Sequence, residues 1–419
     1  MSLRLRRSNR MLTLTGIAII ILLSSVSFGT SVGENRALAQ SVERDYWPTE
    51  GWLNSTPEEQ GMDSAKLQEM MDYIENETIP IKSMVVVRNG RIVLEEFPLS
   101  TIYHENSTHL LYSVTKSFTS ALIGIALDKG FLDNVSQLLL SFFPDYNITN
   151  MDERRDRITI EHLLTMRSGM FWDETTAPYD SPANGIYHLN TGDGVEYSLN
   201  LDMVAEPGEL WHYNTGASHL LAAIVQVASG MTTLDFAEQY LFGPLGIDNV
   251  RWYHDTAGWY KGGYDLSIRT RDMAKFGYLF LNNGTWDGQQ IVSSEWVNTS
   301  ISSHTLFWDH QGYGYQWWTI PSLGLYRAAG LYGQYIYVVP EHDLVVAFSS
   351  TMGRNDPYPH DSLVAQFIIP AVITGGPQLD SYDIFNVSLV VILFAPVLIA
   401  GGYWLAVVRR ATQVVESHL

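Results

Sequence analysis

The chain has 419 residues and no cysteine, and its 45 acidic against 25 basic residues give a net charge of −20. This length can hold one large domain or two small ones, and an apolar content of 46% indicates a globular chain rather than a disordered one. The acidic balance disfavours nucleic acid and anionic lipid as partners. The lack of cysteine excludes disulfides, thiol nucleophiles and cysteine metal sites.

The first 39 residues have the pattern of an export signal. Four arginines precede an uncharged run from Met11 to Phe28, and Ala37-Leu38-Ala39 offers a small-residue cleavage site. The interval from Phe28 to Ala39 is longer than a cleaved signal usually shows. Residues 1–39 are therefore predicted to be a signal peptide or an N-terminal anchor, with residues 40–383 outside the cytoplasm in both cases.

The elements expected after residue 40 are strands at the two ends of the region and helices between them. A helix is expected to start at Asp63 or Ser64, and Asn89-Gly90 between two β-branched runs predicts a hairpin. Further predicted helices cover 113–130, 160–166, 217–228 and 267–281, and further strands cover 334–339 and 344–348. This order predicts one α+β domain over residues 40–380, whose sheet joins N- and C-terminal segments around a helical insertion.

The C-terminal segment is predicted to cross a membrane. The run Ile384–Val408 has 25 residues without a charge, and Arg409 and Arg410 follow at once. By the positive-inside tendency, residues 409–419 form a short cytoplasmic tail. The domain is thus expected at the cell membrane, outside the cytoplasm, and attached through this C-terminal helix.

A candidate nucleophile lies in Ser113-Val114-Thr115-Lys116 at the start of a predicted helix. Residues three apart on a helix share one face, so the Lys116 amine can reach the Ser113 hydroxyl and take its proton. The helix N-terminus favours the negative charge that develops there. Short motifs of this kind arise by chance, so the assignment depends on partners elsewhere in the chain.

Two such partners follow in order, Tyr213-Asn214-Thr215 and the segment Ala329–Gln334. With Ser113–Lys116 at the head, they resemble the motifs of the serine β-lactamase-like hydrolases. That superfamily includes class C β-lactamases, D-alanyl-D-alanine carboxypeptidases, esterases and 6-aminohexanoate-dimer hydrolases. The resemblance covers roughly residues 45–375 and implies a β-lactamase-like α+β fold, with helices packed on an antiparallel sheet.

The resemblance also implies a role for each matched residue. Ser113 would be the acylating nucleophile, and Lys116 its proton acceptor. Tyr213 would be a general base or a proton relay to the leaving group, and the backbone N–H groups of Ser113 and Gln334 would form the oxyanion hole. Two protonation schemes stay open: a neutral Lys116 that acts as the base, or a charged Lys116 that lowers the pKa of Tyr213.

Substrate contacts are expected from Thr215, Tyr332, Gly333, Trp172 and Tyr179, without a metal or cofactor. Thr215 stands where the second motif has asparagine.

Leu331 stands where the third motif begins with lysine or histidine. In the family, that cation binds the carboxylate of penicillins and D-alanyl peptides, so its loss favours esters or small amides as substrates. β-Lactamase or carboxypeptidase activity and a catalytically silent ligand-binding relative are the alternatives.

Overall fold

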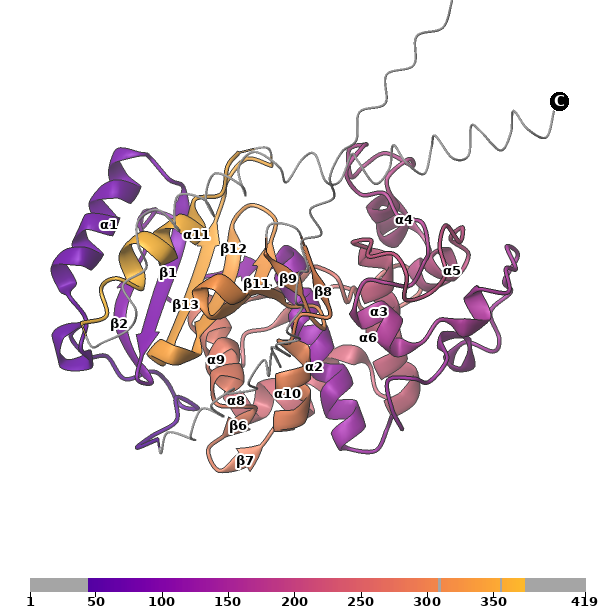
Figure 1. The fold of residues 1–419 in the computed structure, drawn as a ribbon, viewed down its shortest axis with the longest axis horizontal. Helices are drawn as coiled ribbons and strands as arrows, with labels where there is room; N and C mark the ends of the chain where they lie inside the picture. The colour runs from indigo at the N-terminus through magenta and orange to yellow at the C-terminus, as the bar shows by residue number, and fades with distance from the viewer. Residues whose placement is uncertain (1–43, 308–309, 355, 374–419) are drawn as a thin grey trace, which may run out of the picture. The chain divides into compact units, whose positions relative to one another are not determined.

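The computed structural model describes residues 44–307, 310–354 and 356–373 (Figure 1). The predicted signal or anchor, the predicted membrane helix 384–408 and the predicted tail lie outside these residues. In the described ranges, no single helix is long and apolar enough to cross a membrane. The pair Thr215–Ser229 and Thr233–Leu245, bent by 79°, meets that test by length and composition only.

The main sheet has eight strands and joins the N- and C-terminal parts of the described chain, as predicted. Its neighbouring strands are antiparallel throughout. The predicted hairpin is present, and Asn89 and Gly90 have φ values of 52° and 78°, as a tight two-residue turn requires. In spatial order the strands are β2 (Arg91–Glu96), β1 (Ile81–Arg88), β13 (Leu344–Ser350), β12 (Gln334–Val339), β11 (Leu325–Gly330), β10 (Trp318–Ile320), β9 (Gly312–Tyr313) and β8 (Thr305–Leu306).

One face of the sheet is covered by α1 (Ser64–Asn76), α11 (His360–Leu363) and the π-helical turn Val364–Ile368. Asp63 caps α1 by accepting hydrogen bonds from the backbone N–H groups of its first turn. The buried side of α1 packs in one cluster with alternate residues of β1, such as Met84 and Val86. The predicted start of this helix is confirmed.

The other face of the sheet is covered by α9 (Thr270–Leu281). A Cβ at Gly277 would lie 2.7 Å from side-chain atoms of Ile336 and Val345, so the absence of a side chain lets the helix approach the sheet closely. The prediction of a helix from residue 267 is wrong at its start. Residues Leu266–Arg269 form β5, because they pair with β3 (Thr108–Leu110) and β4 (Arg251–Trp252) in a three-stranded sheet.

The helical insertion is built around α2 (Thr115–Asp128) and α6 (Thr215–Ser229), which pack against each other. Residues 115–126 of α2 are all buried, which a helix at the centre of a core requires. The predicted helix 160–166 ends earlier, because Met166 has a φ of 57°, which a right-handed helix cannot accommodate. The remaining α-helices of the described residues are α3 (Ile160–Leu164), α4 (Gly185–Thr191), α5 (Gly194–Leu199), α7 (Thr233–Ala237), α8 (Gly243–Leu245) and α10 (Ser294–Ser300), and a small hairpin joins β6 (Thr285–Trp286) to β7 (Gln289–Gln290).

Candidate active site

Ser113 lies in a 3₁₀ turn, Tyr112–Val114, that leads from β3 into α2. Tyr112 has a φ of 48°, a left-handed conformation that a bulky residue rarely adopts. Its ring meets the ring of Tyr332 edge to face, with the centroids 4.9 Å apart. Ser113 stays partly exposed while Val114, Thr115 and Lys116 are buried. The strained turn therefore presents the Ser113 hydroxyl to solvent at the edge of the core.

Lys116 is 1% exposed, and its Nζ lies within hydrogen-bond distance of three oxygen atoms. Its Nζ lies 3.0 Å from Ser113 Oγ, 3.0 Å from Thr215 Oγ1 and 2.9 Å from the carbonyl oxygen of Gly263. No described carboxylate lies within ion-pair distance of this amine. Burial lowers the pKa of Lys116 to about 8, against a smaller opposite effect of the Glu174 carboxylate.

The Gly263 carbonyl is a contact that sequence reasoning missed. A Cβ at Gly263 would lie 2.6 Å from Thr215 Cγ2 and 3.3 Å from Lys116 Nζ, and one at Gly262 would lie 2.2 Å from the carbonyl oxygen of Ser218. Two glycines in succession thus let this loop reach the junction of α2 and α6. The two adjacent glycines indicate in the sequence that the backbone approaches another segment closely. The sequence does not indicate which helices it approaches.

Tyr213 immediately precedes Asn214, whose side chain caps α6. The centroid of the Tyr213 ring lies 4.8 Å from Lys116 Nζ, and the ring stacks on Trp318. Burial raises the pKa of the Tyr213 hydroxyl well above its ordinary value, with a further rise from Tyr313 and Glu174. A hydrogen bond with Ser113 opposes this rise. Ser113, Lys116, Tyr213 and Thr215, from separate parts of the sequence, therefore meet at one place.

The β11–β12 hairpin closes the other side of Ser113. A Cβ at Gly330 would lie 2.4 Å from the Leu111 carbonyl oxygen, so the end of β11 is pressed against the Ser113 turn. The N–H of Leu331, the next residue, has no hydrogen-bond acceptor in the described part of the chain. Gln334 instead pairs with Gly330 across the hairpin, and its buried side chain bonds Ser349 and Ser350.

The other residues of this hairpin have mainly structural contacts. The N–H of Tyr332 donates to the Tyr358 hydroxyl at 3.1 Å. Gly333 has a φ of 86°, and a Cβ there would lie 2.6 Å from His360. Glycine is therefore required at 333 by the backbone and by the packing beneath it.

Trp172 and Tyr179 belong to a loop beside Tyr213. Trp172 is buried rather than open to a ligand, and a Cβ at Gly216 would lie 2.8 Å from its ring. Its indole N–H donates to Glu174 Oε2 at 2.5 Å. Tyr179 is half-buried beneath the Arg354 guanidinium, 4.3 Å from its ring centroid. Glu174 is a carboxylate of this loop that the sequence-based prediction did not include.

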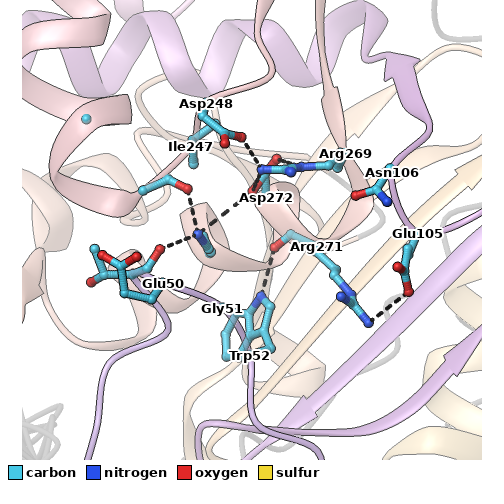
Figure 2. A pocket seen from close by; sticks show the side chains of 14 residues that line it. Glu50, Gly51, Trp52, Glu105, Asn106, Ile247, Asp248, Arg269, Arg271 and Asp272 are labelled. Carbon is cyan, nitrogen blue, oxygen red and sulfur yellow. Dashed lines mark hydrogen bonds and ion pairs between the residues drawn. The ribbon is translucent and has the colours of Figure 1, made fainter.

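A separate pocket of about 370 Å³ lies where the segment 49–52 meets the start of α9 (Figure 2). Its cations are engaged: Arg269 pairs with Asp248 and Asp272, and Arg271 with Glu95. Lys275 donates to the carbonyl oxygens of Thr49 and Gly246. None of the residues that line this pocket contacts Ser113 or Lys116 in the described ranges. The segment 49–52 is joined to α9 by hydrogen bonds, from Lys275 to the Thr49 carbonyl oxygen and from the Trp52 indole to the Arg271 carbonyl oxygen.

The fold and the similarity to known proteins place the chain in the class of the serine hydrolases. The profile of the beta-lactamase family matches residues 64–367, more than half of the chain, so the chain belongs to this family. The predicted family and the predicted α+β fold are confirmed.

Three similar proteins illustrate the range of the family. The chain is 23% identical to a 6-aminohexanoate-dimer hydrolase of Paenarthrobacter ureafaciens, over 63% of this chain and 71% of that protein. It is 32% identical to a penicillin-binding protein of Bacillus subtilis, over 44% of this chain and 37% of that protein. The structure of an octameric penicillin-binding protein homologue from Pyrococcus abyssi has the same fold, with a TM-score of 0.59 and 20% identity, over 74% of this chain and 78% of that one.

Proposed function

We propose that this protein hydrolyses esters or small amides through an acyl-enzyme on Ser113. The observation that carries the proposal is the Lys116 amine. It is buried, lies 3.0 Å from the Ser113 hydroxyl, and has no carboxylate within ion-pair distance in the described residues. Burial lowers the pKa of this amine to about 8, so at physiological pH a fraction of it is neutral and can accept the proton of the serine.

The hydrogen bonds of Lys116 favour the scheme in which it is the base. A neutral amine can donate to the Gly263 carbonyl and to Thr215 Oγ1, and its lone pair then faces the Ser113 hydroxyl. The Tyr213 hydroxyl, whose pKa is raised by burial, keeps its proton and can pass it to a leaving group. Tyr213 thus serves as the relay, and Lys116 as the acceptor.

The reaction then proceeds in two steps, acylation of Ser113 and hydrolysis of the acyl-enzyme. Ser113 Oγ bonds to the substrate carbonyl carbon while its proton moves to Lys116, and the bond to the alcohol or amine breaks as Tyr213 supplies a proton. Lys116 returns a proton to Tyr213. Water then attacks the acyl carbon and gives a proton to Lys116, and the bond between this carbon and Ser113 Oγ breaks as Lys116 passes the proton to Oγ, which releases the acid and restores the Ser113 hydroxyl.

Two backbone N–H groups are needed to stabilise the oxyanion. Ser113 supplies one in this proposal. For the second N–H group, the sequence predicts Gln334. The contact of Gly330 with the Ser113 turn and the N–H of Leu331, which has no acceptor among the described residues, favour Leu331 instead.

The substrate class follows from the side chain at 331. Leu331 offers no cation for a substrate carboxylate, so esters and amides without that carboxylate are preferred over penicillins and D-alanyl peptides. β-Lactamase or carboxypeptidase activity is the competing catalytic function.

The site of action in this proposal is the outer face of the cell membrane. Its support is the sequence alone: the basic flank and apolar run before residue 40, and the uncharged run 384–408 followed by two arginines. Protease treatment of intact cells tests it, because an exported domain is digested and an internal one is protected.

The catalytic proposal is tested by labelling the full-length chain with a fluorophosphonate and locating the adduct by mass spectrometry. We expect the adduct on Ser113 and none in Ser113→Ala. A chain that takes no label, or a label that persists in Ser113→Ala, would point to the silent ligand-binding alternative. Turnover of p-nitrophenyl esters against nitrocefin then separates the two catalytic functions, and nitrocefin hydrolysis without esterase activity would refute the ester and amide preference.

A further inference from the structure

Glu174 places a carboxylate beside the candidate catalytic groups without a cationic partner of its own. Its Oε2 accepts one hydrogen bond, from the Trp172 indole, and no described Arg, Lys or His lies within ion-pair distance. The side chain is only half-buried. The carboxylate is therefore partly exposed and open to a charged ligand.

The position of Glu174 is fixed by contacts with the catalytic segment. The carbonyl oxygen of Trp172 bonds His212, next to Tyr213, at 2.6 Å. The Trp172 ring lies against Gly216, the residue after Thr215. On its outer side, the carbonyl oxygen of Glu174 accepts a hydrogen bond from Arg354 at 2.9 Å. The loop that carries the carboxylate is thus held against the first turn of α6.

The charge of Glu174 acts on several groups around the candidate catalytic residues. Besides burial, which is the larger cause in each case, its charge raises the pKa of Tyr179, Tyr264 and Tyr313. It also acts on Lys116 and Tyr213. The Arg354 guanidinium, which stacks over Tyr179, acts in the opposite sense on the pKa of Tyr179. The charge of the Glu174 carboxylate therefore reaches the candidate catalytic groups Lys116 and Tyr213.

We propose that Glu174 is a specificity-determining residue that selects substrates bearing a cationic nitrogen, such as an ammonium group, within a few bonds of the scissile carbonyl. The inference rests on the proposed hydrolase function and deepens it. A cation near Glu174 finds an unpaired carboxylate and aromatic rings on which it can stack. A substrate carboxylate there meets repulsion, and Leu331 supplies no compensating charge.

The test compares substrates that differ only in charge. Acetylcholine and 3,3-dimethylbutyl acetate have the same shape, with nitrogen replaced by carbon, and they place the cation on the leaving group. The p-nitrophenyl esters of 4-(trimethylammonio)butyrate and of 5,5-dimethylhexanoate place it on the acyl group. We expect the cationic member of at least one pair to have about tenfold higher kcat/KM.

The variant Glu174→Gln should reduce the ratio of kcat/KM between the cationic and the neutral member of a pair to about threefold or less. The control variant Glu196→Gln removes an exposed carboxylate on α5 and should leave this ratio unchanged. The ratio is the correct readout because any effect of Glu174 on Lys116 is common to both members of a pair and cancels. If Glu174→Gln does not fold, raising the ionic strength of the wild-type assay from about 0.05 M to about 0.5 M should reduce the ratio instead.

The possible failures are distinguishable. If the neutral esters are turned over and Ser113 is labelled, but the charged members are no better or the preference survives in Glu174→Gln, this inference is overturned and the hydrolase proposal stands. If no ester is turned over and Ser113 takes no label, both are overturned.

Discussion

Two buried lysines, Lys116 in the candidate active site and Lys275 beside the pocket of Figure 2, differ in what surrounds their charge. Both donate to backbone carbonyl oxygens, and burial lowers the pKa of both. Lys275 also has the Asp272 carboxylate 4.0 Å away, which opposes the shift, whereas Lys116 faces a serine hydroxyl. The nearby carboxylate stabilises the charged form of Lys275, which suits a structural role. Lys116 has no such carboxylate within ion-pair distance among the described residues, so it can lose its proton more easily and act as a base.

The largest expected difference between the two is catalytic. Lys116→Met removes the proposed proton acceptor and should lower kcat/KM for a p-nitrophenyl ester by about 10³–10⁴-fold. Circular dichroism should show a folded protein, since methionine suits a buried site. Activity within tenfold of wild type in Lys116→Met would remove the central argument for this base.

The pH dependence of kcat/KM should report the Lys116 amine. The pKa of Lys116 is lowered to about 8, and only the neutral amine accepts a proton. The rate should therefore rise about tenfold per pH unit below 8 and level off above it. A profile measured from pH 6 to 9 on a neutral ester checks this, and a flat profile would mean that another group is the base.

Lys275→Met should change stability instead of catalysis. The carbonyl oxygens of Thr49 and Gly246 lose their donor, which should cost about 1–3 kcal/mol of the free energy of unfolding. Urea unfolding measures this loss, and kcat/KM of the folded protein should stay within about twofold of wild type. A catalytic loss as large as that of Lys116→Met would erase the contrast between the two lysines.

The smallest expected effect concerns Thr215. Thr215→Val removes the hydroxyl that bonds Lys116 but keeps the shape of the side chain, and should lower kcat/KM about tenfold. Thr215→Ser keeps the hydroxyl and should recover most of the activity. Equal activity in both variants would show that the hydroxyl does not orient the amine.

The sequence predicted the elements whose signals are local. The Asn89-Gly90 turn, the Asp63 cap and the largely apolar strands near the C-terminal end of the described chain each depend on a few neighbouring residues, and all are present. The predicted start of a helix at residue 267 was wrong because Leu266–Arg269 pair with β3 and β4 and therefore form a strand. That pairing involves residues far away in the chain, which local periodicity does not report.

For the site, the sequence by itself determined which residue types are present and that Ser113 and Lys116 share one helical turn. Only the tertiary structure decided that Lys116 has no carboxylate partner among the described residues, that the Gly263 carbonyl bonds its amine, and that Gly330 lies against the nucleophile turn. The physical reason is that the basicity of a lysine depends on burial and on neighbouring charges, which segments distant in sequence supply when they pack together.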